Sequence, residues 1–312
     1  MKTVSILFLG GAKRVSMARL FKQAGKLRGL EVNIFGYELD TRVPLACEGK
    51  IITGEKWKSP TLWKHLGETL RHHDIGIVVP FVDPAVEIAA GCRSRFPGVF
   101  AAAGSAEMAH AMFDKSEADA IFRQKGIAVP AAISSETPVY PFIAKPRTGS
   151  ASKGIVVVYD ETQGVPPDFS PAEYLLQEYV TDAVEYTVDC YVANDGRVLV
   201  VVPRQRIEVT GGEVNVTRTE KNPRLMNMAT EALVKLGLRG PVTLQYLFDG
   251  KTDRFLLMEI NPRLGGGAVC SVHAGADLPG FILDEARGIA PAECFDWRDG
   301  TYMTRYMQEV IF

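Results

Sequence analysis

The chain has 312 residues, 46% hydrophobic and 23% charged, with a formal net charge of -2. This is ordinary globular composition, and the length suffices for two or three packed lobes. The charge balance supplies no basic field, which argues against nucleic acid or an anionic membrane as a partner. The five cysteines stand at no metal-ligand or redox spacing, so we expect free thiols in a reducing compartment.

The first residues predict a buried strand rather than a targeting segment. The apolar run from Val4 to Leu9 is too short for a secretory signal, and Lys13 and Arg14 follow it closely. No apolar run approaches the ~18 residues that a membrane-spanning helix requires. We therefore expect a soluble, cytoplasmic protein without a membrane partner.

The first hundred residues alternate between strand and helix patterns. Ser59 is expected to cap the second helix, with Pro60 at its first position. The alternation predicts an α/β unit, an open parallel sheet with helices on both faces. Strands are expected at 4–11, 31–40, 49–53 and 75–81, and helices at 16–27, 59–74 and 84–96.

The remainder of the chain has an α+β pattern, with a domain boundary expected near 104–115. A helical stretch at 104–130 falls into two pieces, the second capped by Asp114. Asn194-Asp195-Gly196 predicts a hairpin turn. Strands are expected at 141–146, 154–160, 174–180, 185–195, 196–210, 241–250 and 253–263, and helices at 222–238 and 277–289.

Residues 145–154, KPRTGSASKG, form the first candidate site. The stretch lacks the Walker pattern, because Lys145 precedes the loop and strands flank it on both sides. The backbone amides of such a hairpin loop can close over a phosphate, with Lys145 reaching it from the sheet. An exposed Gly/Ser turn with solvated charges is the open alternative.

Residues 255–267, FLLMEINPRLGGG, form the second candidate site. Glu259 and Asn261 alternate along a strand and therefore share a face. A carboxylate beside an amide makes a hard-oxygen site suited to magnesium. Gln245 on the preceding strand is expected to join them, and Arg263 to meet a transferring phosphoryl group. The alternative is a strand end emerging into solvent.

Three charged residues extend this set. Glu178 ends an apolar strand and Glu185 opens the next, an arrangement that suits an adenine edge and ribose hydroxyls. Lys115 stands at the start of a helix, where a nearby anion would offset an unfavourable cation. Ordinary solvated surface residues are the alternative for each.

Together, in this order, these motifs resemble the ATP-grasp superfamily over essentially the whole chain. Within it, the nearest likeness is to one ATP-grasp unit of the carbamoyl phosphate synthetase large subunit and its stand-alone relatives. The resemblance implies a Rossmann-like pre-ATP-grasp domain over 1–108, a grasp N-lobe with a glycine-rich lid over 109–180, and a C-lobe with the magnesium site over 181–312. With one grasp unit and no glutaminase segment, the chain is not expected to make carbamoyl phosphate.

The resemblance also implies the role of each motif. Lys145 and Arg263 would act in catalysis, Lys145 with Lys115 on the α- and β-phosphates and Arg263 on the transferred group. Magnesium, expected as two ions with Mn²⁺ as a substitute, would be held by Gln245, Glu259 and Asn261. The implied ATP-binding residues are Lys115, Lys145, Thr148, Gly149, Ser150, Ala151, Ser152, Gly154, Gln177, Glu178, Tyr179, Val180 and Glu185.

The implied reaction joins a carboxylate to an amine or thiol through an acyl phosphate, forming ADP and phosphate. A phosphotransferase and an ATP-binding regulatory module without turnover are the open alternatives. A dehydrogenase is disfavoured, because FLGGAKR lacks the third glycine of the dinucleotide fingerprint. The expected partners are small-molecule carboxylates and amines, and homo-oligomer formation is left open.

The acceptor side is less specified. Arg204 and Arg206, at alternate strand positions, are predicted to grip a carboxylate together with Arg263. A solvated edge strand is the alternative. A packing role is expected for Cys270 and His273. The other acceptor candidates are Lys13, Arg14, Glu38, Asp40 and Asp83, and Ser271 in the loop expected after Arg263.

Overall fold

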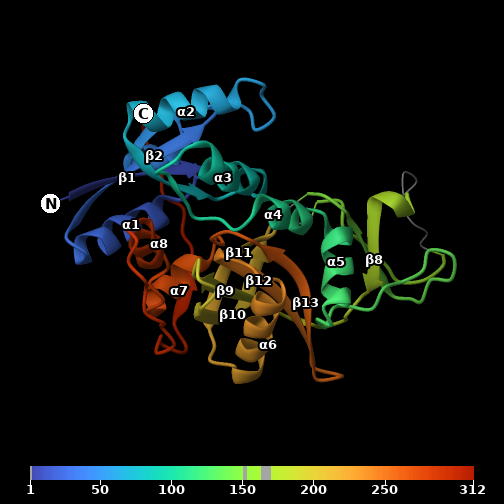
Figure 1. Cartoon of the computed structure of the whole chain (residues 1–312). Helices are drawn as coiled ribbons and strands as arrows, with labels where there is room; N and C mark the ends of the chain where they lie inside the picture. Colours follow the sequence, from blue (N-terminus) through green and yellow to red (C-terminus); the bar gives the residue numbers. More distant parts are fainter. Residues whose placement is uncertain (1, 150–152, 163–169) are drawn as a thin grey trace.

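The structure is a computed structural model that describes residues 2–149, 153–162 and 170–312. Its N-terminal part, drawn in blue and cyan in Figure 1, contains a parallel sheet. The strand order of this sheet is β3-β2-β1-β4-β5. β1 and β4 are neighbours at the centre of the sheet. From β1 the chain adds strands β2 and β3 on one side, and from β4 it adds β5 on the other side, so the strand order reverses between β1 and β4. The α/β prediction is confirmed. The strands are β1 (Lys2–Leu9), β2 (Leu30–Glu38), β3 (Lys50–Thr53), β4 (Ile75–Pro80) and β5 (Phe100–Ala101).

Helices cover both faces of this sheet, because successive side chains of each strand point to opposite faces. Ile6 and Phe8 of β1 lie in one core with α1, whereas Leu7 and Leu9 lie in another with α2 and α3. The elements are α1 (Val15–Leu27), the 3-10 turn η1 (Pro44–Cys47), α2 (Leu62–His72), α3 (Asp83–Arg95) and α4 (Ala106–Phe113).

Helix α5 (Lys115–Gln124) leads into a small antiparallel sheet of order β7-β6-β8. This sheet has a separate core of four buried residues, Phe142, Ala144, Val158 and Leu176. Because β6 pairs with β7, the predicted hairpin around 145–154 is confirmed. The elements are β6 (Phe142–Pro146), β7 (Val156–Val158), the 3-10 turn η2 (Pro171–Glu173) and β8 (Tyr174–Glu178).

The third part is an antiparallel sheet of order β13-β12-β9-β10-β11-β14. Helix α6 packs on it, and Tyr191, Val200 and Val202 from its other face join the core of α1, α7 and α8. One core therefore connects the first and third parts. The elements are β9 (Val184–Val192), β10 (Val198–Thr210), β11 (Glu213–Thr219), α6 (Pro223–Lys235), β12 (Gly240–Asp249), β13 (Arg254–Asn261), α7 (Ala268–Ala274), α8 (Leu278–Ala286) and β14 (Tyr302–Thr304).

Two local predictions were wrong, and one was confirmed. Helix α2 begins at Leu62, because the Ser59 hydroxyl accepts from the Thr61 amide within a preceding turn instead of capping the helix. Residues 268–274, expected as loop, form the short helix α7. Asp114 caps α5 by accepting from the amides of Ser116 and Glu117.

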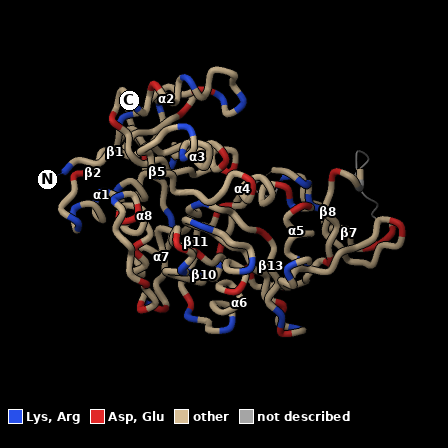
Figure 2. The backbone as a smooth tube through the Cα atoms, in the orientation of Figure 1, with Lys and Arg blue, Asp and Glu red and all other residues tan. Residues whose placement is uncertain are grey.

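The charges of the molecule are interspersed. Figure 2 shows basic and acidic residues alternating along all three parts, rather than a basic region set apart from an acidic one. Among the described residues, no helix is both long and apolar enough to cross a membrane.

Candidate active site

A cavity of about 600 Å³ lies where the three parts meet. Its size is that of a typical small-molecule site. Eight Lys and Arg side chains but only four Asp and Glu line it among the described residues, whereas the whole chain has 35 basic and 37 acidic residues. The positive charge is therefore concentrated inside, where it favours anionic ligands.

Lys145 projects into this cavity from β6 and is only 6% exposed. Its ammonium donates to Gln177 Oε1 at 2.9 Å, and Gln177 Nε2 in turn donates to Asp119 Oδ1 at 2.8 Å. Burial lowers the pKa of Lys145 to about 8, a shift that Glu259 opposes and Lys115 reinforces. Lys145 is thus a buried cation bonded to a neutral amide.

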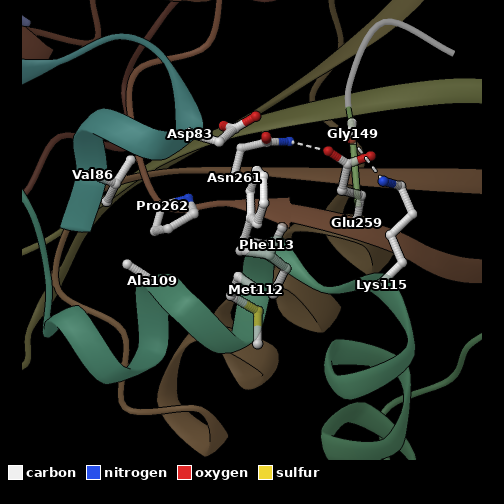
Figure 3. A pocket seen from close by; sticks show the side chains of 11 residues that line it. Asp83, Val86, Ala109, Met112, Phe113, Lys115, Gly149, Glu259, Asn261 and Pro262 are labelled. Carbon is white, nitrogen blue, oxygen red and sulfur yellow. Dashed lines mark hydrogen bonds between the residues drawn. The ribbon is translucent and has the colours of Figure 1, made fainter. Parts of the chain in front are cut away.

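Lys115 faces the same space from the first turn of α5. Its Nζ donates to the carbonyl of Gly149 at 2.8 Å, a contact drawn in Figure 3. Thr148, Gly149 and Lys153 from the predicted lid also line the cavity. Gly154 ends the loop in a left-handed conformation with φ +73°. The predicted ligands Ser150, Ala151 and Ser152 lie outside the described residues.

The expected adenine segment, residues 177–180, spans the end of β8 and is held to its surroundings. Glu178 Oε1 accepts from the Ala131 amide at 2.9 Å, and Arg254 lies 3.4 Å from its other oxygen. The Tyr179 amide donates to Pro141 O. Residues 177–180, which include Val180, are not among the described residues that line the cavity. Their role in nucleotide binding stays a prediction.

The three expected metal ligands lie together on neighbouring strands. Gln245 of β12 is the direct partner of Glu259 on β13, and Thr243 is the partner of Asn261. Asn261 Nδ2 donates to Glu259 Oε1 at 2.9 Å, as Figure 3 shows. One face thus presents a carboxylate and two amide oxygens, a donor set that fits magnesium.

Arg263 connects this cluster to the first part of the molecule. Its Nη2 donates to Asn261 Oδ1 at 3.1 Å, and its Nε donates to Asp83 Oδ1 at 2.6 Å. Asp83 stands at the first residue of α3, directly beyond the end of β4. The ion pair fixes the Arg263 guanidinium between the carboxyl end of β4 and the cluster of Gln245, Glu259 and Asn261.

The two predicted acceptor arginines line the cavity but are engaged with carboxylates of the chain itself. Arg204, 1% exposed, makes a bidentate pair with Asp189 at 2.7 and 3.3 Å. Arg206 pairs with Glu185 at 2.9 Å, so the expected ribose ligand is also occupied. Arg204, Arg206 and Glu185 all line the cavity, and their ligand roles stay predictions.

The other acceptor candidates are distributed unevenly. Arg14 and Asp83 line the cavity, whereas Lys13, Glu38 and Asp40 are not among its described lining residues. Ser271 is fully buried and donates to Asp189, and Cys270 is buried as well. The backbone carbonyl of His273 accepts a hydrogen bond from the Arg298 guanidinium.

Two residues of this network escaped the sequence reasoning. Asp119 accepts from Gln177 and from Arg123 four residues on, so it fixes the amide that holds Lys145. Its position four residues after Lys115, on the same helix face, is the signal that could have indicated it. Thr243 alternates with Gln245 on β12, and its hydroxyl donates to the Arg263 carbonyl at 3.0 Å.

Comparisons with known proteins agree with this architecture. Residues 170–309 match a family model described as ATP-grasp in the biosynthetic pathway with Ter operon. No curated protein matches the sequence. Among solved structures, the biotin carboxylase of Campylobacter jejuni has 19% identity and a TM-score of 0.74, covering 95% of this chain and 73% of that one.

Two further solved structures have the same fold. The biotin carboxylase domain of Hydrogenobacter thermophilus 2-oxoglutarate carboxylase has 15% identity and a TM-score of 0.75, covering 96% of this chain and 73% of that one. The Staphylococcus aureus N5-carboxyaminoimidazole synthetase has 15% identity and a TM-score of 0.72, covering 94% and 80%. The particular likeness to carbamoyl phosphate synthetase stays a prediction. Residues 170–309 thus match an ATP-grasp family model, and the chain has the fold of the biotin carboxylase and N5-carboxyaminoimidazole synthetase structures.

Proposed function

We propose that this protein is an ATP- and magnesium-dependent ligase that activates a carboxylate as an acyl phosphate for attack by an amine or thiol. One observation carries the proposal: a single cavity is lined by Lys115, Lys145, Gln245, Glu259 and Arg263. Cations for the phosphates, oxygens for the metal and an arginine for the transferred group are what phosphoryl transfer requires.

The two lysines suit the phosphates because neither has a direct carboxylate partner among the residues that the structure describes. Lys145 donates to an amide oxygen and Lys115 to a backbone carbonyl. Both keep their positive charge for an anionic ligand, and the burial of Lys145 strengthens its electrostatic effect. Gly149 places the start of the lid against Lys115, so closure of the lid over the nucleotide would exclude water.

Gln245, Glu259 and Asn261 would hold magnesium, which when bound offsets the charge on the transferring phosphate. Arg263 would orient the transferred group, since Asp83 and Asn261 fix its guanidinium. In the first step, an acceptor carboxylate oxygen bonds to the γ-phosphorus and the bond to ADP breaks. In the second, the nucleophile bonds to the acyl carbon, loses its proton, and phosphate leaves.

The test is ADP release from MgATP over a panel of carboxylates paired with amines and thiols, with products read by mass spectrometry and phosphorus NMR. Inorganic phosphate with a new amide or thioester is expected. Glu259→Ala is expected to lower turnover at least 1000-fold with an unchanged circular dichroism spectrum, because it removes the carboxylate of the metal site. A Glu259→Ala variant as active as the parent would refute the metal assignment.

The same NMR spectra separate the ligase from a phosphotransferase, which would leave the phosphate on its product. Binding of MgATP without any ADP release across the panel would instead favour an ATP-binding module without turnover. Arg71→Gln, an exposed substitution in the last turn of α2, is the matched surface control.

A further inference from the structure

In the described part of the cavity wall, one arginine has no partner for its charge. Of the five arginines that line the cavity, Arg204, Arg206, Arg263 and Arg305 each form an ion pair with a carboxylate. Among the described residues, the Arg14 guanidinium has no ion pair and no hydrogen bond; its nearest aromatic contact is Phe81, with the ring centroid 6.0 Å away. A half-buried cation without a counter-charge is costly unless a ligand supplies one.

The position of Arg14 is that of a ligand-binding residue in this kind of sheet. It follows β1 and immediately precedes α1, and Phe81 and Asp83 follow β4. Because the strand order reverses between β1 and β4, their carboxyl ends form the crevice in which open parallel sheets bind ligands. The backbone fixes the residue there, since the Arg14 amide donates to Gly11 O at 2.7 Å.

A second arginine, Arg305, lies close to Arg14 next to Gly266. A Cβ atom built on Gly266 would lie 2.9 Å from Arg14 Nη1 and 3.1 Å from Arg305 Nη2. The missing side chain therefore lets two guanidinium groups approach the same point of the wall. Helix α1 also contacts α7 and α8, which brings Arg14 from the first part of the molecule to this wall (Figure 1).

The local charges leave this point positive. Arg14, Arg263 and Arg305 are accompanied by Asp83, paired with Arg263, and Glu213, paired with Arg305. Burial and the neighbouring charges of Arg263 and Arg305 lower the pKa of Arg14, a shift that Glu213 partly opposes. An anion placed between Arg14 and Arg305 would relieve the repulsion, and a guanidinium fork suits carboxylate and phosphate alike.

We propose that Arg14 and Arg305 bind a second anionic group of the acceptor, so that the substrate carries two anionic groups and is called a dianion here in that sense: a dicarboxylate or a phosphorylated carboxylate. One carboxylate is activated at Arg263, and the second anionic group is held over Gly266. This inference rests on the proposed ligase function, because it names the class of acceptor used in that reaction.

The test measures acceptor binding with the nucleotide end filled by saturating MgADP. Matched pairs are titrated by calorimetry: glutarate against butyrate, succinate against propionate, and 3-phosphoglycerate against glycerate. At least one dianion is expected to bind tenfold or more tightly than its monoanionic match. The dicarboxylate and phosphate arms identify which second group the site prefers. Equal binding within every pair, or binding by none, overturns the proposal.

Two variants examine the site by different routes. Arg14→Gln removes the charge, and Gly266→Ala keeps both charges but places a methyl group where the guanidiniums meet. Each is expected to weaken the preferred dianion at least tenfold while MgADP affinity stays within twofold, which also reports folding. Arg71→Gln removes a charge elsewhere and should change neither. If Arg14→Gln does not fold, the dianion affinity of Gly266→Ala is the test. Unchanged dianion affinity in the folded variants overturns the proposal.

Failure of this inference is distinguishable from failure of the ligase proposal. ADP and phosphate release with a monoanionic acceptor, unaffected by Arg14→Gln, would support the ligase and overturn the second anion site. Arg14-dependent binding of a dianion without ADP release would support the anion site and count against the ligase.

Discussion

The two ends of the cavity hold their cations in different ways. At the nucleotide end, Lys145 and Lys115 bond to an amide oxygen and a backbone carbonyl, both neutral. At the acceptor end, Arg204 and Arg263 are bound by Asp189 and Asp83. A cation held by a neutral acceptor keeps its charge for a ligand, whereas one held by a carboxylate is fixed in orientation and largely neutralised.

Because of this difference, basic side chains at the two ends of the cavity are expected to have different roles. The lysines act as point charges for a polyanion, whereas Arg204, fully buried against Asp189, mainly shapes the wall on which an acceptor lies. Arg14 is the exception at the acceptor end, since it has the free charge of the lysines and the planar fork of the arginines. Three predictions would break or sharpen the comparison.

The largest expected effect concerns the buried pair of Arg204 and Asp189. Asp189→Asn leaves Arg204 charged and buried, so the free energy of unfolding should fall by about 3–5 kcal/mol. Arg204→Met combined with Asp189→Leu should recover most of that loss, because no unpaired charge remains. Urea denaturation followed by circular dichroism measures both, and an Asp189→Asn variant as stable as the parent would contradict the structural role of this pair.

The next effect is the pH dependence of nucleotide binding. The pKa of Lys145 is about 8 in the free protein, so the charged form predominates below pH 8. Above it, binding must take up a proton, and MgADP affinity should fall by up to tenfold per pH unit between pH 8 and 10. Calorimetry over that range is the measurement. Lys145→Arg, which stays charged, should give a flat profile; a parallel decline in both proteins would contradict the role of Lys145.

The smallest effect concerns Asp119, which positions Gln177 and through it Lys145. Asp119→Asn removes a negative charge that favours protonated Lys145, so the pH at which MgADP affinity begins to fall should move downward. The loss of affinity at pH 7 should be only a few-fold. Glu117→Gln, an exposed change on the same helix, is the control. An unshifted profile for Asp119→Asn would show that the residue has only a structural part.

The strands and the general fold followed from local patterns. The apolar runs of the first hundred residues specified a parallel sheet, since only strands buried on both faces need continuous hydrophobicity. The alternation of Glu259 and Asn261 predicted a shared face, and the cross-strand pairing of Glu259 with Gln245 agrees with it. Ser59 was misjudged because a hydroxyl can satisfy a turn as readily as a helix.

The sequence by itself determined which residue types could bind phosphate and metal, because strand periodicity and loop composition are local properties. The tertiary structure decided which charges remain available. Arg204 and Arg206 have the same spacing as ligand-binding residues, but Asp189 and Glu185 meet them from β9. In the sequence, nothing distinguishes Arg14 from Lys13 as a ligand-binding candidate. In the structure, the reversal of strand order and the missing side chain of Gly266 place Arg14 beside Arg305. Counter-charges come from segments distant in sequence, so only the folded chain selects them.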